Sequence, residues 1–350
     1  MSEKGLANVI AGETALCKLG GEHEELYYRG YNACKLAEKH SYEAIAFLLL
    51  EGHLPSEEEM LSYKASLAEM TTMPIEVEKT LRELPVDANA MDVLRTGVSL
   101  LGIYEPETNA YNGLEIANRL MVILPRFLAV WRGISIPKEA SVAEAVCLAC
   151  CDEPVSEPFI NAMNQSLVLY AEHEFNASTF AARVTSATLS DIYSAVCSAI
   201  GTLRGPLHGG ANEQALYLIK SFNDVASVEP GIKQKLANKE KLMGFGHRVY
   251  RTKDPRSHKL YAILESLPNT DLFDIAKEIE RVMMDEKNLI SNVDFYTAVL
   301  YEQMKINPKL FVAIFVFGRI AGWTAHILEQ RENNRLIRPL AEYIGPDPID

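Results

Sequence analysis

Apolar residues recur at three- and four-residue intervals along most of this chain, and this periodicity constrains the fold more than any other feature. The spacing is typical of amphipathic α-helices, in which residues three and four apart share a face. It is clearest in residues 26–52, 56–70 and 113–131. Alternating β-branched runs are scarce, and only residues 13–29, around Gly20–Gly21, predict a short hairpin. With no βαβ rhythm and no internal repeat, we predict a mostly α protein rather than a Rossmann or TIM-barrel fold.

The composition is that of an ordinary globular protein with room for two lobes. The chain has 350 residues, of which 48% are hydrophobic and 23% charged. Its net charge of -13 argues against nucleic acid as the partner, because phosphate binding needs a surplus of Lys and Arg. An acidic chain can still bind an anion where it gathers its few cations locally.

The most apolar stretch, residues 310–327, is long enough to raise the question of a membrane span. Arg319 lies at its centre, where a charge facing lipid would be costly. We therefore predict a buried helix in a large core and no membrane association. The N-terminal segment MSEKGLANVIAGETALC lacks the apolar region of a signal peptide, so we expect a cytoplasmic protein.

Three of the six cysteines, Cys147, Cys150 and Cys151, form a C-x-x-C-C cluster. No second Cys or His pair follows at the spacing of a zinc site. In a segment with helical spacing, such cysteines are typical of small buried hydrophobic side chains. We predict neither a metal here nor a disulfide in a reducing cytosol.

Three of the eight histidines have a context that indicates chemistry, namely His173, His208 and His247. The Glu-His-Glu run at His173 resembles a set of metal ligands. However, Ala177 stands where an H-E-x-x-H pattern needs its second His, so a hydrogen-bonding role fits better. The other five are typical of surface or satisfied helix positions: His23, His40, His53, His258 and His326.

His208 lies in R-G-P-L-H-G-G-A-N-E-Q, just before a segment with helical spacing. The positive end of a helix dipole disfavours the imidazolium form. A neutral imidazole can donate a hydrogen bond to a carbonyl oxygen that gains negative charge. The alternative is a loop histidine that caps backbone groups.

His247 lies in M-G-F-G-H-R-V-Y-R-T-K-D-P-R. The match to a dinucleotide-binding loop is weak, because the third glycine and the preceding strand are missing. Two glycines beside a histidine favour close approach of backbone amides to an anionic or carbonyl ligand. Four cations follow in an otherwise acidic chain, for which the alternative is a solvated basic face: Arg248, Arg251, Lys253 and Arg256.

Asp294 lies between Val293 and Phe295 in N-V-D-F-Y-T-A-V. Apolar neighbours raise the pKa of a carboxyl group, and a base that removes a proton from carbon needs this basicity. The alternative is an N-cap aspartate for the helix that follows. Arg319, inside its apolar helix, requires an anionic partner, which a carboxylate substrate could supply.

Together these segments resemble the citrate synthase family over nearly the whole chain. The likeness rests on GPLHGGANE, GFGHRVYRTKDPR and NVDFY, in the family's order, supported by AEHEFNAST and FGRIAGW. It implies a mostly helical homodimer of two-lobed chains, with the active-site cleft between a large and a small lobe. The large lobe would comprise residues 1–209 and 304–350, and the small lobe residues 210–303.

The resemblance implies three catalytic residues. Asp294 would take a proton from the α-carbon of an acyl-CoA thioester. His208 would stabilise the resulting enol or enolate oxygen, and His247 would polarise the ketone of oxaloacetate. Hydrolysis of the acyl-CoA product would follow, and no metal or redox cofactor is implied.

The resemblance also implies binding residues. His173, Arg256 and Arg319 match positions that hold oxaloacetate, whereas Arg338 matches one supplied by the neighbouring subunit. Paired cations suit a dianionic keto acid. The loop that meets coenzyme A would consist of Lys241, Leu242, Met243, Gly244, Phe245 and Gly246.

Other segments resemble the bacterial 2-methylcitrate synthases, the branch that uses propionyl-CoA: GLANVIAGETALCKLG, LYYRGY, MDVLRTGVSLLG, LYAEHEFNASTF and AHILEQRENNRLIRP. Tyr170 stands where typical citrate synthases have the first His of H-A-D-H-E, and residues 296–298 read Y-T-A rather than Y-S-G. Propionyl-CoA is therefore the expected acyl donor. Acetyl-CoA, or use of both, is the alternative, because one methylene changes discrimination by only about 1–3 kcal/mol.

Two departures from the family pattern accompany this likeness. Residues 134–156 form a shorter region than in typical members, and the chain ends soon after residues 343–346, so contacts from a longer family tail are not expected. The alternative from another functional class is a helical interaction protein that has lost catalysis.

Overall fold

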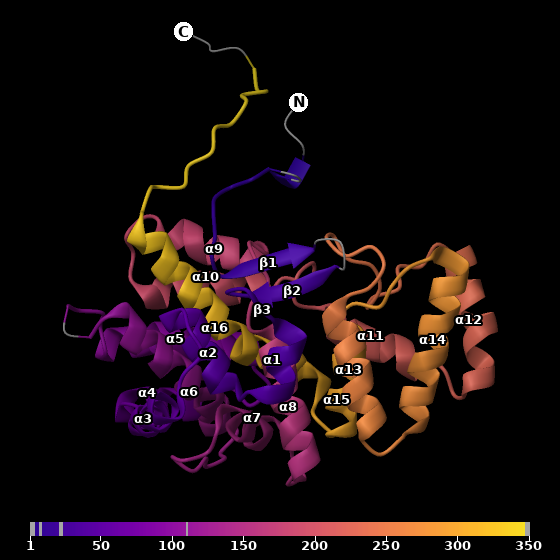
Figure 1. The fold of residues 1–350 in the computed structure, drawn as a ribbon, viewed down its shortest axis with the longest axis horizontal. Helices are drawn as coiled ribbons and strands as arrows, with labels where there is room; N and C mark the ends of the chain where they lie inside the picture. Colours follow the sequence, from indigo (N-terminus) through magenta and orange to yellow (C-terminus); the bar gives the residue numbers. More distant parts are fainter. Residues whose placement is uncertain (1–3, 7–8, 21–23, 110, 347–350) are drawn as a thin grey trace.

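The computed structural model describes residues 4–6, 9–20, 24–109 and 111–346, and most of this part of the chain is helical (Figure 1). The predicted mostly α class is thereby confirmed. The helix predicted over residues 113–131 is present as α6 (Gly113–Trp131). The one predicted over residues 56–70 is α3 (Glu57–Glu69), which begins at a capping box between Ser56 and Glu59.

A small antiparallel sheet lies near the N-terminus, with strands β1 (Cys17–Gly20), β2 (Glu25–Tyr28) and β3 (Tyr31–Asn32) in that order. The register pairs Cys17 with Tyr28 and Gly20 with Glu25. The predicted hairpin is therefore present, although Gly21 at its tip lies outside the described residues.

The helix predicted from residue 26 begins later, at Ala33. Residues 26–32 belong to β2, β3 and their turn instead. Alternate side chains, Leu26 and Tyr28, are buried, as a half-buried strand requires. The Tyr28 hydroxyl donates to the carbonyl of Val168 at 3.0 Å and so ties the sheet to the helical core.

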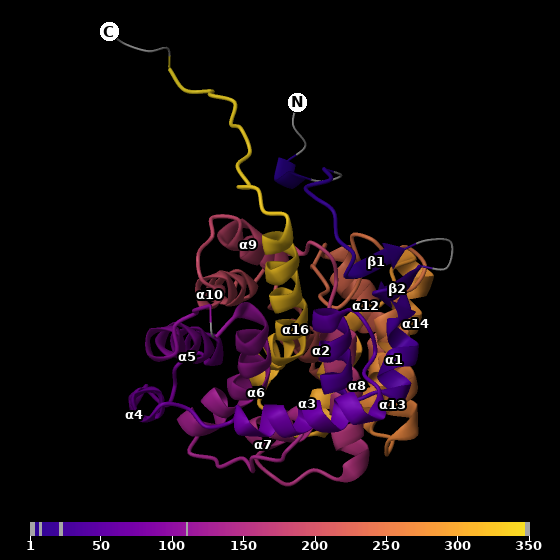
Figure 2. The same cartoon turned by 60° about the vertical axis from the view of Figure 1, so that its left-hand side comes forward.

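A larger helical body is built around α16 (Phe311–Glu332), which packs against α2, α6, α8, α9 and α10 (Figures 1 and 2). The helices and helical turns that complete it are α1 (Ala33–Lys39), α2 (Tyr42–Glu51), α4 (Ile75–Glu83), α5 (Ala90–Tyr104), α7 (Val142–Cys150), α8 (Glu157–Tyr170), α9 (Ala177–Ser186), α10 (Ile192–Leu203) and η2 (Pro308–Leu310). The short turn η1 (Lys4–Leu6) lies on the N-terminal segment outside this body (Figure 1).

The predicted burial of residues 310–327 is confirmed. Pro308–Glu332 is long and apolar enough to cross a membrane, but 89% of its most apolar window is buried inside the protein. Arg319 at the middle of α16 is 1% exposed. α16 is therefore the central helix of the core, with one guanidinium enclosed in it.

A second group of helices, α11–α15, lies on one side of the molecule, coloured orange in Figure 1. Its members pack on one another, and α11 and α13 also contact the larger body. Their bounds are α11 (Ala211–Lys220), α12 (Val225–Ala237), α13 (Pro255–Ser266), α14 (Asp271–Lys287) and α15 (Val293–Gln303). The lobe limits at residues 209/210 and 303/304 stay a prediction.

The C-x-x-C-C cluster lies on α7 and its C-cap, where Cys147, Cys150 and Cys151 are all buried. Their interpretation as small core side chains is therefore confirmed. No group of three or more His, Cys, Asp or Glu able to hold a metal ion occurs in the part of the chain that the structure describes.

Candidate active site

His247 and Arg256 meet at the start of α13. Asp254, the N-cap of that helix, receives two hydrogen bonds from the Arg256 guanidinium, at 3.0 Å from Nε and 2.8 Å from Nη2, and a third from the backbone N–H of Arg256 at 3.0 Å. Nδ1 of His247 accepts the backbone N–H groups of Val249 at 3.0 Å and Tyr250 at 3.3 Å. The neutral ring therefore carries its proton on Nε2.

This tautomer leaves two donors facing the same space. Nε2 of His247 lies 3.4 Å from Nη2 of Arg256, and neither nitrogen can accept a proton from the other. Burial, followed by the positive charge of Arg256, lowers the pKa of His247 to about 4, so the ring is neutral at physiological pH. An oxygen acceptor placed between them, such as a ketone or carboxylate oxygen, would satisfy both.

His173 lies against this pair. Its ring centroid is 5.2 Å from that of His247 and 5.7 Å from that of Tyr250. Burial, and then the charge of Arg256, lowers the pKa of His173 well below its ordinary value. Its buried Nε2 has no hydrogen-bond partner among the described residues. A buried polar atom without a partner is costly, so this nitrogen is suited to a ligand.

His208 lies in the turn between α10 and α11. Its backbone N–H donates to the carbonyl of Gly205 at 3.0 Å, and its Nε2 is 2.8 Å from the hydroxyl oxygen of Ser178. Burial, and then the charge of Arg319, lowers the pKa of His208 to about 4. The predicted neutral imidazole is therefore present, but burial rather than a helix dipole is its main cause.

Asp294 is the second residue of α15 and not its N-cap. Asn292 is the N-cap and accepts the backbone N–H of Asp294 at 3.1 Å, so the N-cap alternative is wrong. Asp294 lies between the buried side chains of Val293 and Phe295. Desolvation raises the pKa of Asp294 to about 6, against the opposing effect of Arg256. A carboxyl group of this kind is a stronger base than an ordinary aspartate.

Arg319 brings an enclosed positive charge to the same region. Its Nε donates to the carbonyl of Tyr170 at 2.5 Å, and its guanidinium carbon lies 4.7 Å from the ring centroid of Phe315. Within the described chain, no carboxylate forms an ion pair with it. A buried cation without a counter-ion is unfavourable, and an anionic ligand would remove this cost.

The structure brings together six of the predicted site residues from both helix groups, and the two arginines among them shift the pKa values of the other four. The six are His173, His208, His247, Arg256, Asp294 and Arg319. Arg319 affects the pKa of His173, His208 and Asp294, and Arg256 that of His173, His247 and Asp294. The alternative of a solvated basic face holds for three of the four cations after His247, because Arg248, Arg251 and Lys253 are exposed, whereas Arg256 is buried.

The predicted coenzyme A loop, residues 241–246, lies against the start of α15. Gly244 has a left-handed backbone with φ 92°, and a Cβ there would lie 2.8 Å from the Phe295 ring. Its carbonyl accepts the N–H of Asn292 at 2.9 Å, and the N–H of Gly246 donates to Ile290 at 2.8 Å. The loop is therefore placed next to Asp294, but the Gly246 amide is already used within the protein.

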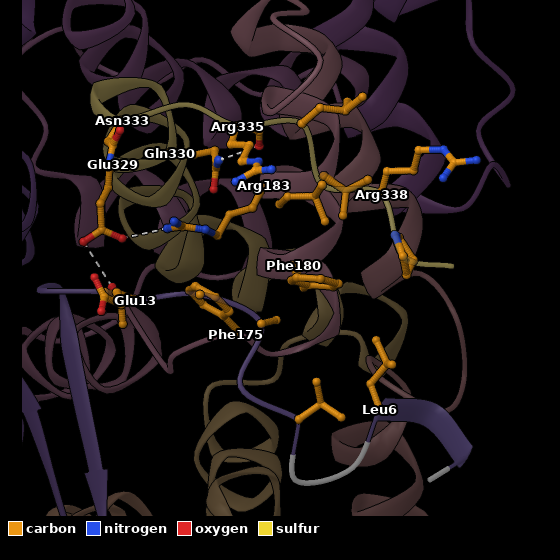
Figure 3. A pocket seen from close by; sticks show the side chains of 18 of the residues that line it. Leu6, Glu13, Phe175, Phe180, Arg183, Glu329, Gln330, Asn333, Arg335 and Arg338 are labelled. Atoms are coloured by element: carbon orange, nitrogen blue, oxygen red, sulfur yellow. Dashed lines mark hydrogen bonds and ion pairs between the residues drawn. The ribbon is translucent and has the colours of Figure 1, made fainter. Parts of the chain in front are cut away.

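Arg338 is apart from the other site residues. It is exposed on the segment after α16, which extends away from the body (Figures 1 and 2). There it lines a groove of about 970 Å³ together with Arg183, Phe175 and Glu329 (Figure 3). Within one chain, Arg338 is thus not brought to the cluster around Asp294.

Two groups near the site were not identified from the sequence. Ser178 contacts His208, and its oxygen also accepts the indole N–H of Trp323 at 3.2 Å. His326 is a satisfied helix residue, as expected, but its partner is the buried Glu172 next to His173. Among the histidines given no role, His23 lies outside the described residues.

Known proteins are similar to this chain over nearly its full length. A family model described as "Citrate synthase, C-terminal domain" matches residues 5–340. A 2-methylcitrate synthase of Shewanella oneidensis is 42% identical over 98% of this chain and 95% of its own. Citrate synthase 2 of Bacillus subtilis is 39% identical over 98% of this chain and 96% of its own.

A solved structure shows the same fold with ligands. It is the ternary complex of carboxymethyl coenzyme A and oxaloacetate with the citrate synthase of Thermoplasma acidophilum. That chain is 32% identical and superposes with a TM-score of 0.89, over 99% of this chain and 97% of its own. The predicted two-lobed helical fold is confirmed by this likeness.

Proposed function

The chain belongs to the citrate synthase family, whose members condense an acyl-CoA with oxaloacetate, and from this premise we propose that it is a 2-methylcitrate synthase. It would join propionyl-CoA to oxaloacetate and hydrolyse the thioester, releasing 2-methylcitrate and coenzyme A. The observation that carries the proposal is the desolvated Asp294 carboxyl group in a site that also encloses the Arg319 guanidinium, which forms no ion pair in the described part of the chain.

Oxaloacetate would bind first to the buried cations. Arg319 has no counter-ion among the residues that the structure describes, so a substrate carboxylate would be its ion-pair partner. Arg256 is already held by Asp254 and would add a directed N–H group beside Nε2–H of His247. These two donors would polarise the ketone, and the free Nε2 of His173 would bind a further oxygen.

Asp294 would then remove a proton from the α-carbon of the thioester, which makes this carbon a nucleophile. His208 would stabilise the enol or enolate oxygen as a neutral donor. The Ser178 hydroxyl has one proton and two acceptors within reach, Nε2 of His208 at 2.8 Å and Oδ1 of Asn176 at 2.8 Å. In the arrangement where it donates to Nε2, the ring proton of His208 is on Nδ1, free for the substrate. Attack on the polarised ketone forms the carbon–carbon bond, and hydrolysis of the thioester follows.

Tyr170 supports a larger acyl group than acetyl. It replaces a polar imidazole with an aromatic ring that packs on Phe315, with centroids 4.5 Å apart. Its hydroxyl donates to Thr297 Oγ1 at 2.8 Å, and the Thr297 hydroxyl shares its proton between the backbone carbonyls of Val293 at 3.0 Å and Asp294 at 3.1 Å. A ring fixed beside the catalytic carboxyl group offers apolar contact to an extra methyl group.

The acyl preference is tested by kcat/KM for the two thioesters. Relatives named for each activity are about equally similar to this chain, so kinetics must decide. We expect a higher value for propionyl-CoA, by about tenfold, since one methylene is worth about 1–3 kcal/mol. A clearly higher value for acetyl-CoA would establish the alternative, a citrate synthase.

The activity is expected to fall in acid as Asp294 becomes protonated. Because its pKa is raised to about 6 in the free protein, kcat/KM should halve near pH 6 and fall about tenfold per unit below that. His208 and His247, with pKa values lowered to about 4, stay neutral above pH 5 and add no further change. The measurement is kcat/KM at low substrate concentrations between pH 5 and 8, and a constant kcat/KM over this range would contradict the role of Asp294.

We also propose that the enzyme is a homodimer in which Arg338 reaches the neighbouring active site. Two observations support this: Arg338 is exposed, and the segment that carries it extends away from its own body (Figure 2). A second carboxylate of oxaloacetate would be the group that it binds.

A further inference from the structure

Three residues of α16 form a face against the segment that carries His173. Arg319, Gly322 and His326 are three and four residues apart in turn, so they share one side of the helix. Arg319 and His326 are separated by about 10 Å along the axis, at about 1.5 Å per residue. A Cβ on Gly322 would lie 2.2 Å from the carbonyl oxygen of Ala171 and 2.3 Å from Oε2 of Glu172. Because residue 322 is glycine, Glu172 can pack between the side chains of Arg319 and His326.

Glu172 could pair with either neighbour, and in the structure it pairs with His326. Its Oε1 is 2.7 Å from Nε2 of His326, and both side chains are fully buried. Its Oε2 has no hydrogen-bond partner within the described chain. The guanidinium of Arg319, one helical turn from Gly322, also lacks an ion pair among the described residues. This is notable because opposite charges in a buried site attract strongly.

His326 is fixed from its other side. Nδ1 lies 2.9 Å from Nη1 of Arg183, which can only donate, so Nδ1 accepts and Nε2 carries the proton that goes to Glu172. Arg183 forms an ion pair with Glu329 at 2.6 Å (Figure 3). Glu329 also accepts the backbone N–H of Ala15 at 2.8 Å. The imidazole is therefore held in the orientation that binds Glu172.

We propose that His326 is a positioning residue for oxaloacetate. By donating to Glu172, it keeps this carboxylate away from Arg319 and leaves the guanidinium available for a substrate carboxylate. Without that donor, the buried Glu172 would gain most by turning to Arg319, where it would occupy the place of the substrate anion. The inference rests on the proposed role of Arg319 in binding oxaloacetate.

The test compares two replacements of His326 and one double variant. His326→Leu removes the donor, and we expect the Kd for oxaloacetate to rise about tenfold to a hundredfold, as for a lost charge-assisted hydrogen bond. His326→Gln retains an N–H donor and should bind nearly as wild type. Glu172→Gln combined with His326→Leu should recover most of the affinity, because a glutamine amide cannot form an ion pair with Arg319.

Oxaloacetate binding is measured by calorimetric titration of the full-length protein, and KM values for oxaloacetate and for propionyl-CoA are measured beside it. Only the values for oxaloacetate should change. Equal losses in His326→Leu and His326→Gln, or a double variant no better than His326→Leu, would show a purely structural role and overturn the inference. Wild-type affinity in all variants would overturn it as well. A wild-type protein that neither binds oxaloacetate nor releases thiol would instead refute the proposed function itself.

Discussion

Asp294→Asn is expected to lower kcat by about two to four orders of magnitude, the usual contribution of a general base. Asparagine has nearly the same size as aspartate. The N-cap residue Asn292 accepts the backbone N–H of residue 294 and makes no bond to its side chain, so the fold should be retained. The amide cannot accept a proton from carbon. The measurement is steady-state thiol release, and KM for oxaloacetate should change little.

A matched control is Asp271→Asn. This aspartate is also at the start of a helix, α14, but it is exposed. The preceding residue, Thr270, contacts Gln303 at the opposite end of α15 from Asp294. Its replacement should leave kcat unaltered. An unchanged thiol-release rate in Asp294→Asn would remove the catalytic assignment and favour the alternative of a helical interaction protein.

Arg319→Met is expected to weaken oxaloacetate binding by about a hundredfold or more, since the ion pair with a buried charge is lost. The same change should leave the thermal unfolding temperature unchanged or raise it. The reason is that this guanidinium is buried and no described residue serves as its counter-ion, so an apolar side chain of similar length removes a cost.

Arg119→Met is the control for this second effect. Arg119 is also buried, but it donates to both carboxylate oxygens of Glu105, at 2.9 and 2.8 Å, and to the carbonyl of Met70. Its replacement leaves those acceptors without a donor and should lower the unfolding temperature. If Arg319→Met destabilises the protein as Arg119→Met does and leaves oxaloacetate binding intact, Arg319 has a structural role only.

The helices were predictable from the sequence wherever a long periodic run was bounded by local signals. α6 and α3 have such runs, and Ser56 marks the start of α3. The start of α1 was not predictable from periodicity, because residues 26–32 are short strands whose burial depends on contacts with α8. Those contacts are about 140 residues away in the sequence.

The site residues were only partly predictable, because each pattern had a second local meaning. Asp294 could have been an N-cap, but Asn292, an equally good cap two residues earlier, takes that position. The neutral state of His208 was expected from a helix dipole, whereas burial is the larger cause. The order of the motifs and the likeness to the family decided between the catalytic and the capping roles of these residues, which local physics alone did not.

The pair of Glu172 and His326 was only half predictable from the sequence. Its two members are 154 residues apart, so no local pattern joins them. The spacing of Arg319, Gly322 and His326 was visible, however, and places a glycine between two polar side chains on one face of an apolar helix. Such a face predicts a close neighbour with an acidic side chain.

The central claim is that these residues form one active site in which an acyl-CoA reacts with oxaloacetate. The most direct measurement is thiol release from propionyl-CoA by the wild-type protein with and without oxaloacetate, together with identification of the product. We predict that thiol appears only when oxaloacetate is present and that 2-methylcitrate forms in equal amount. Thiol release that does not depend on oxaloacetate, or none with either propionyl-CoA or acetyl-CoA, would contradict it.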